Sequence, residues 1–238
     1  MSLQATDVRT GYGSLPVVHG VTLRVDDTEV VAIVGPNGAG KTSLVKAIMG
    51  QLPLMGGTVT FDGVDLATIR PADRQAAGMA YVPQTGSTFP DLTVEDNLRV
   101  SFSTLDGAAI GAAIEDTFAR FPVLGERRKQ LAKTLSGGER QMLAFSSGVG
   151  TGPRFIALDE PTTGLAPRIV DGLVEEILAF RAEGASILWV VEEDPLVILP
   201  HVDRVYVLSA GSVQTEMSAR ELMADTALQE LFFGTEAT

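Results

Sequence analysis

The chain has 238 residues, no cysteine, and 18 basic against 30 acidic residues, which gives a formal net charge of −12. This length suits one large α/β domain or one domain with small appendages. The absence of cysteine excludes disulfide scaffolds, thiolate zinc sites and cysteine nucleophiles, and the acidic balance argues against nucleic acid as a partner. The sequence has no apolar run near the roughly 18–20 residues of a spanning helix, and we expect no signal peptide. We therefore expect a soluble intracellular protein.

Short apolar runs alternate with helical patterns along the chain. Continuous runs rich in β-branched residues are typical of strands buried on both faces of a parallel sheet. They are Val30–Val34, Phe155–Leu158, Ile187–Val191 and Val205–Leu208. Helical patterns cover about 40–50, 138–150, 167–182 and 194–200. This alternation predicts an α/β fold with a mostly parallel sheet.

Residues 1–30 and 56–66 differ, because apolar and polar side chains alternate there. Gly56-Gly57 and Asp62-Gly63 are typical turn pairs within or beside these stretches. Alternation with such turns predicts antiparallel hairpins, for example around 59–64. We expect these residues to form an antiparallel β subdomain attached to the parallel core.

The stretch of about 86–135 lacks strong strand runs and is predicted to be helical, with helices at 94–103 and 107–121. We therefore expect an inserted helical subdomain over about 86–150 within a single domain of residues 1–238. Two further features have ordinary structural interpretations. Trp189 lies in an apolar strand and is predicted to be a core residue, and the charge run 126–129 is interpreted as a solvated helix face.

A phosphate-binding loop is the strongest motif of the sequence. Residues 35–42 fit the pattern G-x-x-x-x-G-K-[ST], between a predicted strand and a predicted helix, which is the context that this motif requires. Its glycines let backbone N–H groups surround phosphate oxygens at a helix N-terminus. Lys41 would reach the β- and γ-phosphates, and the Thr42 hydroxyl would hold Mg²⁺. The candidate nucleotide-binding residues here are Gly35, Asn37, Gly38, Ala39, Gly40, Lys41, Thr42 and Ser43.

A second signal is the strand at 155–158, which ends in two acids, Asp159 and Glu160. Asp159 is positioned to hold Mg²⁺ directly or through water, and Glu160 is a candidate general base that polarises the attacking water. Many strands end in acids, so this signal depends on the phosphate loop. Together the two motifs predict a nucleotide-hydrolysing site.

Ser136-Gly137-Gly138 is a turn that opens a second helix, and so a second anion-binding N-terminus. One chain does not need two such sites for one nucleotide. The economical interpretation is that this loop covers the γ-phosphate held by another subunit. The alternative for Ser136 by itself is an ordinary helix cap.

The stretch Leu135–Gln141 resembles the signature motif of the ATPase subunits of ABC transporters, and the resemblance covers essentially the whole chain. It implies that ATP and Mg²⁺ are the ligands and that Tyr12 stacks on adenine, although the local pattern also fits a half-buried strand aromatic. It implies that Gln84 contacts Mg²⁺ and the attacking water. It also implies that residues 159–167 supply the Mg²⁺ acid, the catalytic glutamate Glu160 and a loop facing a second subunit.

Several stretches are similar to the shorter ATPase subunit of branched-chain amino acid importers, and urea and amide importer subunits share them. They are Gly164–Pro167, Thr93–Leu98, Phe121–Leu124 and Gln141–Ala144. The resemblance implies a peripheral ATPase subunit at the cytoplasmic face of the membrane, powering an importer. Its partners would be a second ATPase subunit, identical or a longer relative, transmembrane permease subunits docked near residues 84–100 around Phe89, and indirectly a substrate-binding protein.

One position departs from the family pattern. Most members place a histidine that hydrogen-bonds the γ-phosphate after the strand at 187–191, and Glu193 stands there in this chain. An ionised Glu193 would repel both the γ-phosphate and Glu160, which predicts slow ATP hydrolysis. If Glu193 points outward, this effect disappears. The alternative function is a regulatory module that binds ATP and dimerises with little hydrolysis.

Overall fold

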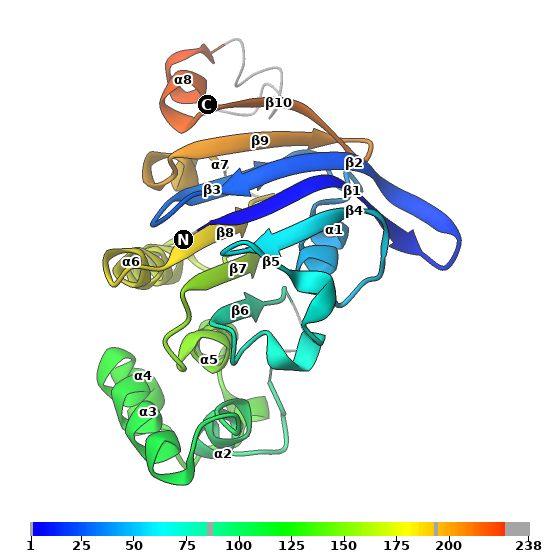
Figure 1. The fold of residues 1–238 in the computed structure, drawn as a ribbon. Helices are drawn as coiled ribbons and strands as arrows, with labels where there is room; N and C mark the ends of the chain where they lie inside the picture. The colour runs from blue at the N-terminus through cyan, green and yellow to red at the C-terminus, as the bar shows by residue number, and fades with distance from the viewer. Residues whose placement is uncertain (1, 85–87, 193–194, 227–238) are drawn as a thin grey trace.

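The computed structural model describes residues 2–84, 88–192 and 195–226. Two sheets and the helices around them form the fold (Figure 1). The larger sheet has the strand order β10-β9-β3-β8-β7-β6, and the smaller sheet has the order β2-β1-β4-β5. The mostly parallel sheet, the antiparallel sheet and the surrounding helices agree with the predicted α/β fold.

The larger sheet is parallel except for its edge strand β10. Its strands are β3 (Val30–Val34), β6 (Met79–Val82), β7 (Phe155–Asp159), β8 (Ser186–Val190), β9 (Arg204–Ser209) and β10 (Ser212–Ser218). The predicted strands are present at β3, β7, β8 and β9. The sequence did not reveal β6, which is only four residues long, or β10, whose residues are largely polar.

Two hydrophobic clusters lie on opposite faces of this sheet, and β3 shows how the sequence divides between them. Val30, Ala32 and Val34 belong to one cluster, and Val31 and Ile33 belong to the other. Successive strand side chains point to opposite faces. A strand buried on both faces therefore needs an unbroken apolar run. Trp189 is fully buried, as predicted.

Helices cover both faces of the larger sheet. They include α1 (Lys41–Ile48), α5 (Gly137–Val149), α6 (Pro167–Ala182), α7 (Pro195–Ile198) and α8 (Ala219–Ala224). Leu44, Val45 and Ile48 of α1 pack into the cluster shared with the smaller sheet, whereas Phe145 of α5 and Phe180 of α6 pack into the other. The helices predicted at 40–50, 138–150 and 167–182 are confirmed to within two residues.

The smaller sheet is antiparallel and consists of β1 (Leu3–Tyr12), β2 (Leu15–Val25), β4 (Leu54–Phe61) and β5 (Val64–Asp65). The predicted hairpin through Asp62-Gly63 is present. The turn predicted at Gly56-Gly57 is wrong, because both glycines lie inside β4. The β1–β4 register shifts there, and a Cβ at Gly57 would strike the Asp7 backbone. The glycine pair therefore serves close strand approach rather than chain reversal.

The remaining helices form a separate group in the lower part of Figure 1. They are α2 (Val94–Ser101), α3 (Gly107–Arg120) and α4 (Pro122–Glu126), and short 3₁₀ turns lie at Leu66–Thr68, Pro71–Asp73, Ala132–Thr134 and Leu199–His201. The interpretation of 126–129 as a helix face is wrong, although these side chains remain partly exposed to solvent. The helix ends at Glu126, and Arg127, Arg128 and Lys129 form ion pairs with Glu139 and Glu95.

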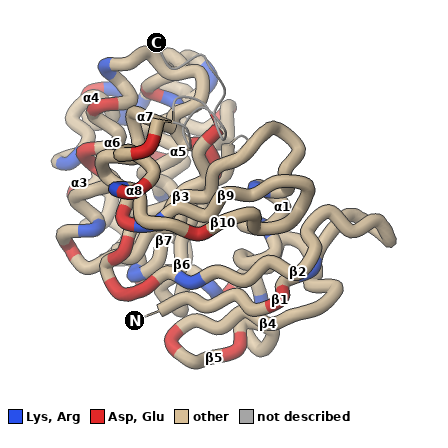
Figure 2. Tube along the Cα trace, turned by 90° about the horizontal axis from the view of Figure 1, so that it is seen from above, with Lys and Arg blue, Asp and Glu red and all other residues tan. Residues whose placement is uncertain are grey.

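Charge is distributed unevenly over the molecule. Figure 2 shows acidic and basic residues along α3, α4, α6 and α8 and few at the end formed by the β1–β2 hairpin. Residues 10–23, which include this hairpin turn, carry no Lys, Arg, Asp or Glu. Among the described residues, no helix combines the length and the apolarity needed to cross a membrane.

Candidate functional site

The phosphate-binding loop connects β3 to α1. Gly40 is the N-cap of α1 with a left-handed φ of 99°, a conformation that glycine adopts without steric cost. No side chain of the described residues caps this helix end. The N–H groups of the first turn of α1 are therefore open to an anion. Ala39 is buried, whereas Asn37 and Gly38 are exposed.

Lys41 is buried at the base of this loop, with a relative exposure of 4%. Its ammonium donates to the Gly35 carbonyl at 2.7 Å and to the Pro36 carbonyl at 3.2 Å. It also pairs with the Glu192 carboxylate at 3.2 Å. Its charge is therefore neutralised by a residue that follows another strand, β8.

Asp159 lies at the end of β7 and is almost completely buried. It accepts hydrogen bonds from the Thr42 hydroxyl at 2.9 Å and from the Tyr81 hydroxyl at 3.0 Å. Burial, and then the neighbouring Asp159 charge, raise the pKa of Tyr81 well above its ordinary value. Tyr81 therefore remains a donor that orients the carboxylate, and the structure brings Thr42 and Asp159 together.

Glu160 follows Asp159 and is 5% exposed, with a positive φ of 53°. Its carboxylate accepts a hydrogen bond of 2.6 Å from the Gln84 amide. Burial, and then a hydrogen bond with Glu192, raise the pKa of the Glu160 carboxyl well above its ordinary value. Raised carboxyl pKa values are typical of general acids and bases that work near neutral pH. Gln84 and Glu160 thus form one polar group.

Tyr12 ends β1 beside the start of α1. Its hydroxyl accepts a hydrogen bond of 3.4 Å from Ser43, and 52% of the residue is exposed. This exposure and its place at the end of β1 fit the half-buried strand aromatic that the local pattern also allowed. A stacking role for this ring stays a prediction.

Ser136 is the N-cap of α5. Its hydroxyl accepts a hydrogen bond from the Glu139 N–H at 3.3 Å, and the Glu139 carboxylate accepts one from the Ser136 N–H at 2.9 Å. A Cβ at Gly138 would approach Ile169 within 3.2 Å, whereas one at Gly137 would meet nothing. The Ser136 cap is therefore present, and Gly137 presents an open surface.

Glu193, the residue predicted at the position of the γ-phosphate histidine, lies outside the described residues.

A cavity of about 140 Å³ lies over the phosphate loop and is bounded by Val17, residues 38–43, Glu160 and Glu192. No part of 136–138 lines it. Glu192 is a member of the site that sequence reasoning missed. The sequence showed only that Glu192 follows the predicted strand at 187–191; that this strand, β8, pairs in parallel with the phosphate-loop strand β3 is known from the fold. The carboxyl ends of neighbouring parallel strands meet at one edge of the sheet.

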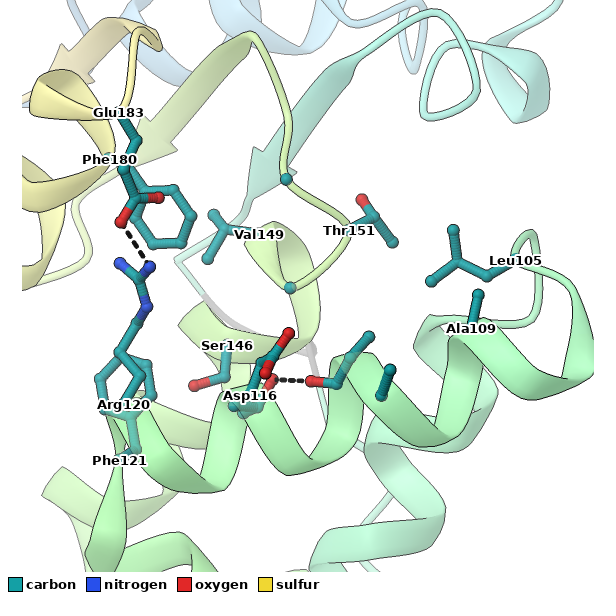
Figure 3. Close-up of a pocket in the computed structure, with 15 residues that line it drawn as sticks. Leu105, Ala109, Asp116, Arg120, Phe121, Ser146, Val149, Thr151, Phe180 and Glu183 are labelled. Carbon is teal, nitrogen blue, oxygen red and sulfur yellow. Dashed lines mark hydrogen bonds and ion pairs between the residues drawn. The ribbon is translucent and has the colours of Figure 1, made fainter.

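A second cavity, of about 370 Å³, lies between α3, the end of α5 and the end of α6 (Figure 3). It contains none of the predicted site residues. Arg120 on α3 lies over the Phe180 ring at 4.5 Å and pairs with Glu183, so the ion pair closes one side of the cavity. Its charged lining residues are Asp116, Arg120 and Glu183, and none of the residues that line it belongs to the phosphate loop.

The geometry of a phosphate loop, a buried Asp159 and a hydrogen-bonded Glu160 is that of a nucleotide-hydrolysing site. A family model described as ABC transporter matches residues 18–163. The chain belongs to this ABC transporter family. It is therefore an ABC ATP-binding subunit and an ATPase.

Relatives of this family match the chain over nearly its whole length. The probable branched-chain amino acid transport ATP-binding protein LivF of Archaeoglobus fulgidus is 33% identical over 98% of this chain and 98% of its own length. The high-affinity branched-chain amino acid transport ATP-binding protein BraG of Pseudomonas aeruginosa is 32% identical over 95% of this chain and 97% of its own. The lipopolysaccharide export system ATP-binding protein LptB of Haemophilus influenzae is 29% identical over 98% of both.

A solved structure of an ATP-binding subunit of an ABC transporter superposes with a TM-score of 0.83 at 26% identity. The match covers 96% of this chain and 94% of that structure. The similarity thus includes both sheets and the helices, and the resemblance that the motifs indicated is confirmed.

Proposed function

We propose that this ABC ATPase powers the import of branched-chain amino acids. The observation that carries the proposal is the 33% identity, over 98% of the chain, with a protein named for branched-chain amino acid transport. BraG, which carries a similar name, supports it at 32% identity. The branch-like stretches at 93–98 and 164–167 agree with this assignment.

Lys41 and the open N-terminus of α1 would bind the ATP phosphates. The Thr42 hydroxyl and the Asp159 carboxylate, 2.9 Å apart, are oxygen donors of the kind that Mg²⁺ accepts together with phosphate oxygens and water. Mg²⁺ bound there would neutralise charge on the β- and γ-phosphates. Gln84 would need to turn its amide oxygen toward the ion, because its nitrogen now donates to Glu160.

Glu160 would take the proton of the attacking water. Gln84 would orient both the water and the Glu160 carboxylate. The Gln84–Glu160 hydrogen bond already places these two side chains together. Ser136, Gly137 and Gly138 would reach the γ-phosphate held by a second ATPase subunit, identical or a longer relative. The open surface at Gly137 supports this role. We retain slow hydrolysis, caused by Glu193, as part of the proposal.

Permease subunits would dock at the loop around Phe89, at the cytoplasmic face of the membrane. The Phe89 side chain is 50% exposed, while its backbone is fixed, because Phe89 N–H donates to Asn97 at 2.7 Å and its carbonyl accepts from Asn97 at 3.0 Å. An exposed apolar side chain on a rigid backbone suits a protein interface. Phe89→Asp should abolish coupling while ATP hydrolysis by the isolated subunit continues.

The test is reconstitution of the chain with permease subunits from its own gene neighbourhood in proteoliposomes. We expect ATP-dependent uptake of leucine, isoleucine or valine with a loaded substrate-binding protein, and loss of uptake with Phe89→Asp. Uptake of urea or a short amide instead would reassign the cargo within the same importer group. Absence of stimulated hydrolysis with any binding protein would favour the regulatory module.

A second candidate is a subunit of an envelope lipid export system, because the LptB protein of Haemophilus influenzae is 29% identical over 98% of this chain. The same preparation separates the two functions. Copurification with permeases that need no substrate-binding protein, and ATP hydrolysis stimulated by lipopolysaccharide, would support export over amino acid import.

A further inference from the structure

Glu192 is brought to the phosphate loop by the sheet, 151 residues along the chain from Lys41. The strands β3 and β8 pair in parallel, and the pairing continues past β8, because the Val191 N–H donates to the Ile33 carbonyl at 3.0 Å. This bond fixes the backbone immediately before Glu192. Its side chain can therefore reach the loop that follows β3.

The Lys41 ammonium has three N–H donors. In the described structure its acceptors are the carbonyls of Gly35 and Pro36 and the carboxylate of Glu192. A phosphate that binds Lys41 must therefore displace one of these partners. The carbonyls belong to the loop itself. The carboxylate is the partner that a phosphate repels and replaces.

Glu192 faces the phosphate-loop cavity beside Glu160 and can leave Lys41. Burial would raise the pKa of the Glu192 carboxyl, but hydrogen bonding with Glu160 and the pairing with Lys41 outweigh it and lower the pKa, which favours the ionised form. The Glu192 side chain is 28% exposed, so it has room to turn away from the loop. A negative oxygen thus stands where the loop would receive an anion.

We propose that Glu192 is a positioning residue. Before ATP binds, its carboxylate takes the place on the Lys41 ammonium that a phosphate oxygen of ATP would take. ATP must displace its carboxylate, so Glu192 lowers the affinity for ATP and holds Lys41 in its binding position between turnovers. The inference deepens the proposed function and rests on the proposal that Lys41 binds nucleotide phosphate. It concerns a residue next to Glu193 and is independent of that residue.

The test is calorimetric titration of ATP and AMP into the full chain without Mg²⁺. Glu192→Gln keeps the shape and the hydrogen-bonding capacity of the side chain but removes its charge. Glu216→Gln is the matched control, because it removes the same charge from an ion pair with Arg204 on the β9–β10 hairpin. We expect Glu192→Gln to bind ATP about tenfold more tightly, an effect between those of exposed and buried ion pairs.

The control should bind ATP like the parent, and AMP should bind all three proteins equally, because it lacks the phosphates that Lys41 would contact. In a Lys41→Met background, Glu192→Gln should produce no gain. With Mg²⁺ present, the KM for ATP should fall with the dissociation constant. A purely structural role of Glu192 would give weaker binding and a lower melting temperature instead, and either of those results would overturn the proposal.

Two outcomes separate this inference from the assignment on which it rests. If Lys41→Met binds ATP as tightly as the parent, the phosphate-loop assignment fails and the inference fails with it. If Lys41→Met weakens binding while Glu192→Gln leaves it unchanged, only the role of Glu192 fails. Should Glu192→Gln not fold, the carboxyl resonance of Glu192 in ¹³C-labelled parent protein must shift on addition of ATP but not of AMP.

Discussion

Two helices of this protein carry glycine at their N-terminal ends, Gly40 as the N-cap of α1 and Gly137 as the first residue of α5, and these ends differ. The first turn of α1 follows a left-handed Gly40 and has no side-chain cap among the described residues. The first turn of α5 is closed by the reciprocal cap of Ser136 and Glu139. An uncapped helix end inside a cavity with a buried lysine suits an anion bound by the same chain.

The N-terminus of α5 is capped, but it can still bind a group from outside the chain. Ser136 uses its oxygen as an acceptor for the Glu139 N–H, and this leaves its hydroxyl proton able to donate. Gly137 faces open space. The comparison teaches that α1 is built to hold a ligand of its own chain, whereas α5 offers a rigid surface to something outside the chain.

The largest expected effect is at Glu160, which borders the same cavity as the N-terminus of α1. Glu160→Gln should lower ATP hydrolysis by about 10²–10⁴-fold, because a general base is lost, while ATP binding is retained. Phosphate release and equilibrium ATP binding check the two statements. Thr163→Val is a control, because Thr163 contacts Glu160 only at 3.5 Å. Hydrolysis by Glu160→Gln at a rate near that of the parent would remove Glu160 from the chemistry.

Lys41→Met should weaken ATP binding by about 100-fold, because charge-assisted hydrogen bonds to phosphate are lost. Binding of AMP should not change. Lys46→Met is the control, since Lys46 lies in the last turn of the same helix. Equal losses for both variants would point to helix damage rather than to phosphate contact.

Gly137→Asp tests the other side of the comparison. The new carboxylate would repel a γ-phosphate held by a second subunit, and we expect hydrolysis to fall by about tenfold or more, while the isolated monomer binds ATP normally. Gly107→Asp is matched, because Gly107 also begins a helix and a Cβ there meets nothing. Impaired ATP binding by the monomer would contradict the separation of the two helix ends.

The smallest expected effect concerns Glu95, which joins α2 to the segment before α5. Its carboxylate lies 3.0 Å from Arg128 and 2.9 Å from Lys129. Hydrogen bonds from Arg128, and then from Lys129, lower the pKa of Glu95 from 4.5 to about 2. A lowered folded-state pKa contributes stability that is present above the unfolded value and is lost as the pH falls through the folded value.

Because Arg128 and Lys129 are more than one-third exposed, solvent screening reduces the contribution to about 1 kcal/mol. Denaturant unfolding should show Glu95→Gln less stable than the parent at pH 7, with a smaller difference at pH 3. Glu115→Gln, whose side chain is 64% exposed, should change stability less. A difference that stays constant between the two pH values would exclude the ionic explanation.

Much of the fold followed from local pattern. The apolar runs at 30–34 and 155–158 predicted strands because burial on both faces requires continuous hydrophobicity. The turn at Asp62-Gly63 was predictable from turn chemistry. The strand at Met79–Val82 was not, since four residues carry too little periodicity. The turn predicted at the glycine pair 56–57 was wrong. Glycine is needed there because the backbone of Asp7, on the neighbouring strand, lies too close for a side chain.

The sequence by itself determined the phosphate loop, the pair Asp159-Glu160 and the family, because these chemistries depend on residues that are adjacent in the chain. Only the tertiary structure placed Glu192 on Lys41 and Arg127 on Glu139. Such pairs join residues on different elements, and their meeting depends on the order of strands in the sheet and the packing of helices. No local pattern in the sequence specifies the order of the strands or the packing of the helices.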